Sequence, residues 1–252
     1  MSGHSKWAKV KHFKGAVDAK RGKLFSKLGK EMTVAAKHGG GDPGFNPRLR
    51  TILLKAKAAN MPADNIERAI KKGTGELPGQ TYEEVTYEGY AAGGVALLVD
   101  VLTDSKNRTA AEIRTIFTKH GGHLAGANAV KHLFHRKGQI AIAREQISED
   151  DLTTLVLEAG GEDMVVHPDG YEIVTDPHQF EAVHKALETK GIKPQSAEVT
   201  FLPLTPVPVA DEKTARAVLS LVDALEDNDD VQNVYSNYDI PDEIMEKAQA
   251  AA

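Results

Sequence analysis

The sequence predicts an α+β protein of three domains, with a three-helix domain followed by two α/β domains, one inserted in the other. Apolar residues recur every three or four positions up to about residue 75 and then alternate as in strands. Residues 138–204 follow the order β-α-β-β-α-β, the ferredoxin-like unit. The segment before this unit lacks a helix and a strand, and one of each is predicted after it, near the C-terminus. These elements therefore form a second α/β domain around the inserted unit, and both α/β domains are predicted to be ferredoxin-like. The predicted divisions are a basic arm (1–17), a three-helix domain (18–75), an α/β domain (81–136 plus 206–240) and an inserted α/β domain (138–204).

Capping residues and glycines set the expected limits of the helical domain. Asp18 is a good N-cap for a first helix, whose apolar stripe runs from Leu24 to Ala35 and stops at Gly39-Gly40-Gly41. Asn46-Pro47 places a capping residue before a proline at the first helical position, which predicts the second helix. Pro62 opens a third, shorter helix that ends at Gly73.

The central α/β domain is expected to contain four further segments before the insertion and two after it. Strands are predicted at Tyr82–Tyr90, Gly94–Thr103 and Val130–Arg136, and a helix at Asn107–His120. After the insertion, a helix over Asp211–Glu226 and a strand over Val231–Tyr235 are expected to close the domain.

The inserted domain has its own turn signals. A strand over Gln139–Ala143 precedes a helix that Ser148 and Asp151 cap. Pro168-Asp169-Gly170 predicts the turn of a hairpin formed by residues 162–175. A helix starting at Asp176-Pro177 and a strand over Ala197–Leu204 complete the unit.

Composition excludes several classes of protein. The chain has 252 residues and no cysteine, which excludes disulfides and thiolate chemistry and fits a reducing compartment. No apolar run approaches the ~20 residues of a membrane span, and the first residues lack the apolar core that is typical of a signal peptide. We therefore expect a cytoplasmic protein that does not enter membranes.

No catalytic or metal-binding motif is found. His120-x-x-His123 and His132-x-x-His135 have spacings that suit a metal poorly on strands, where the two rings point to opposite faces. The acidic run at 226–230 lacks the central glycine and distal glutamate of a calcium loop, so a helix-to-strand turn is expected there. No phosphate-binding loop or nucleophile elbow is present. The sequence predicts no catalytic residue, no metal, no cofactor and no enzyme.

The charge distribution is the main functional signal. Residues 1–75 hold 17 Lys and Arg against 5 Asp and Glu, whereas the rest holds 14 against 31. Such asymmetry indicates a polyanion partner for the basic part, and nucleic acid is the expected one. The predicted binding residues are Lys6, Trp7, Lys9, Lys11, Lys14, Lys20, Arg21, Lys23, Lys27 and Lys30. Two alternatives remain open at this point: a solvated tail, or contact of these cations with the acidic part of the same or a neighbouring molecule.

A smaller basic cluster occurs in the acidic remainder. Its predicted contact residues are Lys106, Asn107, Arg108 and Arg114. The alternative is a surface helix on which Arg108 pairs with Glu112 one turn away.

Several motifs resemble the YebC family over nearly the whole chain. These are residues 2–7 (SGHSKW), 11–14 (KHFK), 18–23 (DAKRGK), 25–27 (FSK), 60–62 (NMP), 87–90 (YEGY), 93–96 (GGVA), 103–104 with 107–109 (TD and NRT) and 230–235 (DVQNVY). The resemblance implies a cytoplasmic protein with one helical and two α/β domains. Members are described as probable transcriptional regulators that bind DNA, mitochondrial relatives as translational activators, and bacterial relatives have been linked to the ribosome.

Three functional hypotheses follow. The first is a DNA-binding transcriptional regulator, and the alternative is a translation factor that associates with ribosomal RNA or the ribosome. The third is a protein-interaction scaffold whose arm docks on an acidic partner. The predicted helices show no face rich in Asn, Gln and Arg for reading base edges, which favours contacts with the phosphate backbone. The oligomeric state is not predicted.

Overall fold

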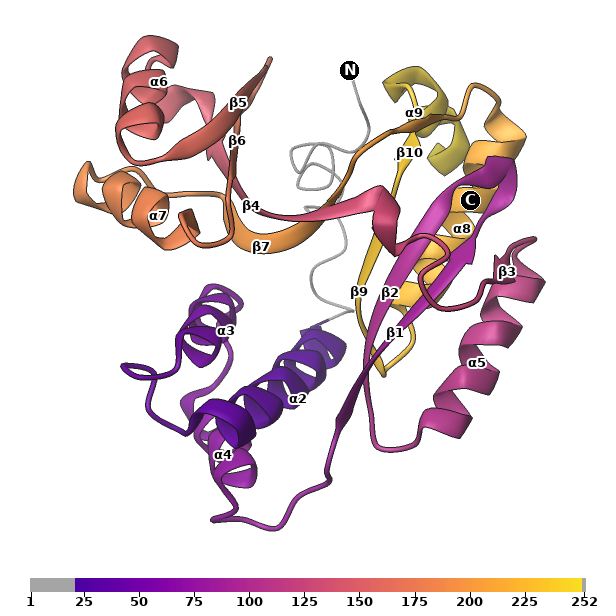
Figure 1. Cartoon of the computed structure of the whole chain (residues 1–252), viewed down its shortest axis with the longest axis horizontal. Coiled ribbons are helices and arrows are strands. Elements are labelled where there is room, and N and C mark those ends of the chain that lie inside the picture. Colours follow the sequence, from indigo (N-terminus) through magenta and orange to yellow (C-terminus); the bar gives the residue numbers. More distant parts are fainter. Residues whose placement is uncertain (1–20, 251–252) are drawn as a thin grey trace.

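The computed structural model describes residues 21–250, which form three lobes (Figure 1). The helical lobe contains α2 (Arg21–Gly39), α3 (Pro47–Ala58) and α4 (Ala63–Thr74). The predicted start of the first helix at Asp18 lies outside the described residues. The α+β class and the arrangement of one helical lobe followed by two α/β lobes agree with the sequence prediction.

Local signals place the ends of these helices. Asn46 caps α3 by accepting a hydrogen bond from the Leu49 N–H at 3.0 Å, and its own amide donates to the Ala35 carbonyl at 2.9 Å. The α4 helix lies close against α2 because Gly73 has no side chain: a Cβ atom there would collide with the Thr33 carbonyl oxygen. Leu28, Met32 and Leu49 are buried at the centre of this lobe.

The central lobe is a four-stranded antiparallel sheet in the order β3-β1-β2-β9. Its strands are β1 (Glu83–Tyr90), β2 (Ala96–Thr103), β3 (His123–Leu124) and β9 (Val231–Ser236), and its helices are α5 (Lys106–Lys119), α8 (Glu212–Glu226) and α9 (Asp242–Ala250). A short parallel pair, β8 (Val207–Pro208) with β10 (Tyr238–Asp239), lies beside the sheet. Strands β1, β2 and β9 and helices α5 and α8 confirm the elements predicted there. The strand predicted at Val130–Arg136 is not part of this sheet, in which β3 takes the fourth place, and α9, β8 and β10 are additional elements.

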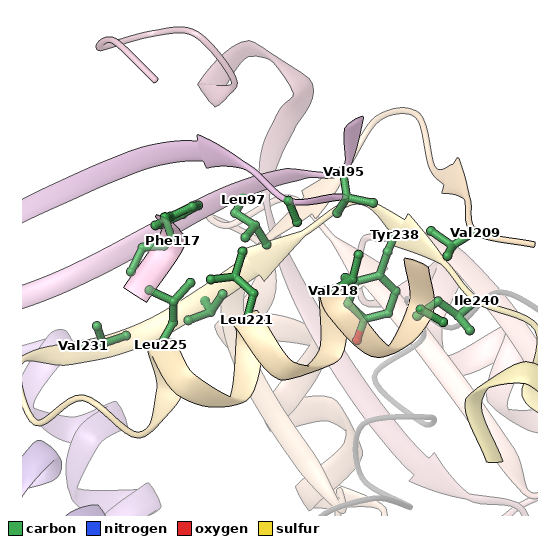
Figure 2. Close-up of a cluster of buried hydrophobic side chains, with 14 of the residues drawn as sticks. Val95, Leu97, Phe117, Val209, Val218, Leu221, Leu225, Val231, Tyr238 and Ile240 are labelled. Carbon is green, nitrogen blue, oxygen red and sulfur yellow. The ribbon is translucent and has the colours of Figure 1, made fainter. Parts of the chain in front are cut away.

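Both faces of the central sheet are covered, which explains why β2 is apolar at nearly every position, with Asp100 as the one charged residue. Leu97 and Val99 point to one face and pack with Phe117, Val218 and other side chains of α5 and α8 (Figure 2). The alternate residue Leu98 points to the opposite face, where Phe134 is buried beside it.

The inserted lobe has the strand order β5-β6-β4-β7, all antiparallel, which is the ferredoxin-like order. Its elements are β4 (Phe134–Ala143), α6 (Glu149–Glu158), β5 (Gly161–His167), β6 (Gly170–Thr175), α7 (Phe180–Thr189) and β7 (Ser196–Pro203). Ser148 caps α6, as predicted. The last helix begins at Phe180 and not at Asp176, because Asp176 instead forms a turn through its carboxylate and its carbonyl.

One prediction about the strands was wrong. The separate strands expected at Val130–Arg136 and Gln139–Ala143 are a single strand, β4, preceded by a 3₁₀ turn at Lys131–Leu133. Gly138 lies inside this strand, where a Cβ atom would collide with Thr175. The glycine therefore serves close packing in the sheet and does not mark a break.

Candidate nucleic-acid interface

Three lysines of the predicted binding set line one face of α2. Lys23, Lys27 and Lys30 are four and three residues apart, and this spacing places them on one side of a helix. Figure 1 shows the N-terminal part of α2 directed toward the central lobe. We call Lys23, Lys27 and Lys30 the α2 lysine face.

This face meets the turn between α8 and β9, residues 226–230, which we call the acidic turn. The Lys23 ammonium lies 2.7 Å from the Asp227 carboxylate. Lys27 donates to the carbonyl oxygen of Glu226 at 2.6 Å, and burial lowers the pKa of Lys27 although nearby acidic residues oppose that shift. The face is therefore in contact with the acidic part of its own chain.

Asp230 is the centre of these contacts. Its carboxylate accepts from Lys30 at 2.8 Å and from Arg108 at 2.6 Å. Thr109 also donates to it at 2.8 Å and Thr103 at 3.2 Å. Only 6% of Asp230 is exposed. Burial alone would raise the pKa of this carboxyl, but the hydrogen bonds from Lys30, Arg108 and Thr109 outweigh burial and hold the pKa well below its ordinary value.

Some cations of the smaller basic cluster are also paired with carboxylates of the same chain. Arg108 pairs with Asp104 at 2.9 Å and approaches Glu112 at 3.8 Å, in addition to Asp230. Lys106 pairs with Glu83 at 2.5 Å. Asn107 and Arg114 are exposed, and Arg114 has no ion pair among residues 21–250. Arg108 thus links the two predicted basic regions through Asp230.

Other cations of the helical lobe bind the inserted and central lobes. Lys55 pairs with Glu198 at 2.8 Å, and its pKa is raised because the nearby carboxylates outweigh burial. Arg50 pairs with Glu181 at 2.8 Å, and Arg48 pairs with Glu84. Together with Lys23 and Lys30, five cations of this lobe form ion pairs with the other two lobes, and Lys27 adds its hydrogen bond to the Glu226 carbonyl.

The remaining predicted residues are placed as follows. Lys6, Trp7, Lys9, Lys11, Lys14 and Lys20 lie outside the described residues. Arg21 is exposed, with its guanidinium 5.7 Å from the centre of the Phe25 ring. A binding role for all of these residues stays a prediction.

Contact of the predicted cations with the acidic part of the same chain was one of the two alternatives left open by the sequence, and Lys23, Lys27 and Lys30 make such contact. The sequence did not indicate that the acidic turn is the segment they meet. The run of acidic residues at 226–230 was expected only to join a helix to a strand, and it does join α8 to β9. The available signal was its charge, which is opposite to that of the spaced lysines 200 positions earlier. Within the described residues, no group of histidines and carboxylates is arranged to hold a metal. No helix in that part of the chain is long and apolar enough to span a bilayer.

Two family models match this chain in adjoining segments. The model described as the TACO1/YebC protein N-terminal domain matches residues 5–76, and that of the TACO1/YebC second and third domain matches residues 82–238. The chain belongs to the TACO1/YebC family. The segment matched by the first model contains the helical lobe, and the segment matched by the second contains both four-stranded sheets.

Relatives of this TACO1/YebC protein are similar over their whole length. A protein of Dictyoglomus turgidum is 57% identical over 98% of this chain and 99% of its own. One of Syntrophus aciditrophicus is 56% identical over 99% of this chain and 100% of its own. Both are named probable transcriptional regulatory proteins.

A crystal structure gives the same result at the level of the fold. A conserved hypothetical protein from Aquifex aeolicus is 50% identical, with a TM-score of 0.86 over 96% of this chain and 99% of its own. The resemblance that the sequence motifs indicated is confirmed.

Proposed function

We propose that this TACO1/YebC protein is a nucleic-acid-binding regulator of gene expression and acts as a DNA-binding transcriptional regulator. The observation that carries the proposal is the excess of 12 positive charges in residues 1–75 of a chain whose net charge is −5. The names of its relatives as probable transcriptional regulatory proteins support the same reading. Cations released from the DNA backbone would drive the association.

The ion pairs between lobes use only part of this positive charge. Five of the 17 cations of residues 1–75 pair with other lobes within the described part of the chain. Lys37, Lys57, Arg68 and Lys72 are exposed and have no ion pair among the described residues. Together with the predicted arm residues and Arg21, they leave the helical lobe a basic surface for a nucleic acid.

An RNA-directed function is the second candidate, and the composition of the helices favours it. The three helices of this lobe carry a single Asn or Gln side chain, Asn65. Base edges in the major groove are read mainly by Arg, Asn and Gln. Binding would therefore rest on the backbone, which suits structured RNA or the ribosome better than it suits sequence-specific recognition of DNA.

The direct test replaces Lys9, Lys11 and Lys14 by Gln in the full chain. Binding to duplex DNA and to a ribosomal RNA fragment is measured over a range of salt concentrations. We expect at least a tenfold loss of affinity and a shallower salt dependence, because up to three phosphate contacts are removed. The matched control replaces Lys185, Lys190 and Lys193, three exposed lysines of the inserted lobe, by Gln.

The outcomes separate the candidates. Preference for DNA supports the transcriptional reading, and preference for RNA, with the protein present in ribosomal gradient fractions, supports the translational one. Equal affinity in the arm variant and the control would refute the arm as the binding site. Binding to neither nucleic acid would favour the protein-interaction scaffold.

A further inference from the structure

A shallow depression of about 660 Å³ lies on the central lobe, between the end of α5 and the first half of α8. Lys119 and His120 line it from the α5 side. Lys213, Arg216 and Ser220 line it from α8. Lys106, Asn107 and Arg108 at the opposite end of α5 do not line it, so it is distinct from the basic cluster at Asp230. We call it the α5–α8 depression.

The depression is basic within an acidic part of the chain. Among its lining residues the single carboxylate, Glu212, is paired with Arg216 at 2.5 Å. The neighbouring Asp211 caps α8 by accepting from the Thr214 N–H at 2.8 Å, and the charge of Lys213 acts on it. Lys119 and Lys213 are exposed and form no ion pair with any described residue. Two cations therefore face solvent here with their hydrogen-bond donors available.

A histidine–serine pair adds a further donor. The Nδ1 atom of His120 lies 2.8 Å from the Oγ atom of Ser220, so a single hydrogen joins them. If Ser220 donates, the Nε2 atom of the neutral ring carries a proton. If His120 donates, the Ser220 hydroxyl proton remains available. Either arrangement leaves one donor, and the pair contributes no negative charge.

We propose that the α5–α8 depression binds a phosphate group of a nucleic-acid backbone. Two ammonium groups and a neutral donor match the oxygens of a phosphodiester, which only accept hydrogen bonds. The depression is wider than one phosphate and open to solvent, so a single free phosphate or nucleotide would be held weakly. A polymer held elsewhere on the protein would gain from this second contact through its high local concentration. The inference rests on the proposed function for its choice of polymer.

The test uses a full-length double variant that carries both Lys119→Gln and Lys213→Gln, which we call the depression variant. Its control is a double variant that carries Lys190→Gln and Lys193→Gln. Each variant loses two exposed lysines, so the overall charge is matched. Affinity for a 12-nucleotide single strand and for a short duplex is measured at several salt concentrations. Backbone NMR signals of residues 119–121 and 213–220 are followed in the wild type with each oligonucleotide, with inorganic pyrophosphate and with a mononucleotide.

We expect roughly a fivefold to twentyfold loss of affinity at low salt in the depression variant and a salt slope shallower by one to two units, because up to two phosphate contacts are removed. The NMR signals of the depression should shift with either oligonucleotide. Stronger shifts with the mononucleotide than with the oligonucleotides would overturn the polymer as ligand and assign the site to a free nucleotide. Equal affinities of the two variants, or no shift in these signals, would overturn the proposal.

The arm variant, in which Lys9, Lys11 and Lys14 are replaced by Gln, allows the second contact and the proposed function to be tested separately. Loss of binding in the arm variant with full binding in the depression variant would sustain the proposed function and reject the second contact. Loss in both would support both. If neither variant loses affinity relative to its control, the arm and the depression are both excluded.

Discussion

The α2 lysine face and the α5–α8 depression are both basic, but they meet different neighbours. Lys23, Lys27 and Lys30 contact the acidic turn of another lobe. Lys119 and Lys213 face solvent. The local density of positive charge predicts a binding surface only where the fold leaves that charge unpaired. In this protein, the α2 lysine face joins two lobes, and the lysines of the α5–α8 depression remain accessible to solvent.

The largest loss of stability is expected where the α2 lysine face is most buried, at Asp230. Replacing Asp230→Asn would leave the Lys30 ammonium and the Arg108 guanidinium without their shared carboxylate. Removing one partner of a buried ion pair costs about 3 kcal/mol, so the free energy of unfolding should fall by that amount in urea denaturation. Asp229→Asn is the control, since the side chain of Asp229 is exposed and only its carbonyl oxygen contacts Lys30. Equal stability of the two variants would show that the network contributes nothing.

Acid should weaken the same network. The pKa of Asp230 is depressed in the folded protein, so its contribution to stability is present above the unfolded pKa of about 3.9 and is lost as pH falls toward the folded value. Between pH 4 and pH 2 the wild type should lose about 2 kcal/mol more than Asp230→Asn. Urea titrations at fixed pH values measure this. Parallel pH profiles of the two proteins would contradict the assignment.

A smaller loss is expected for Lys30→Gln. The Lys30 side chain is 15% exposed and bonds both Asp230 and the Asp229 carbonyl. Arg108 and Thr109 would still neutralise and bond Asp230, so the loss should be about 1.5 kcal/mol. Lys37→Gln on the same helix serves as the control because Lys37 is exposed and has no ion pair among the described residues. A thermal shift no larger than that of the control would refute the prediction.

The smallest loss of stability is expected at the exposed end of the α2 lysine face, at Lys23. In the pair of Lys23 with Asp227, the side chains are 44% and 59% exposed. Such pairs contribute roughly 0.2–1 kcal/mol and are screened by salt. The loss for Lys23→Gln should therefore be measurable at low ionic strength and vanish near 1 M salt. A loss that persists at high salt would indicate that Lys23 acts through packing.

Short-range signals explain what could be predicted. Asn46 caps α3, Ser148 caps α6 and Asp211 caps α8, each through a hydrogen bond to a backbone N–H three residues away. The β-α-β-β-α-β order specified the inserted sheet. The predicted break in β4 fell between Arg136 and Gln139, and Gly138 lies in that gap. Sequence alone does not distinguish a glycine that ends a strand from one required by a neighbouring strand. The accessible cations of the depression come from two helices about 100 residues apart, so no local pattern could show them together.

The sequence by itself determined the helices and most strands, the three-part division into one helical and two α/β lobes, the family and the concentration of positive charge near the N-terminus. These properties depend on residue type and on spacings of a few positions. Only the tertiary structure decided which cations form ion pairs within the protein and which remain exposed. Lys30 and Asp230 are separated by 200 residues and meet at 2.8 Å because α2 packs against the turn after α8. Electrostatic pairing acts through space over a few ångströms, so the use of each charge is fixed by folding and not by its place along the chain.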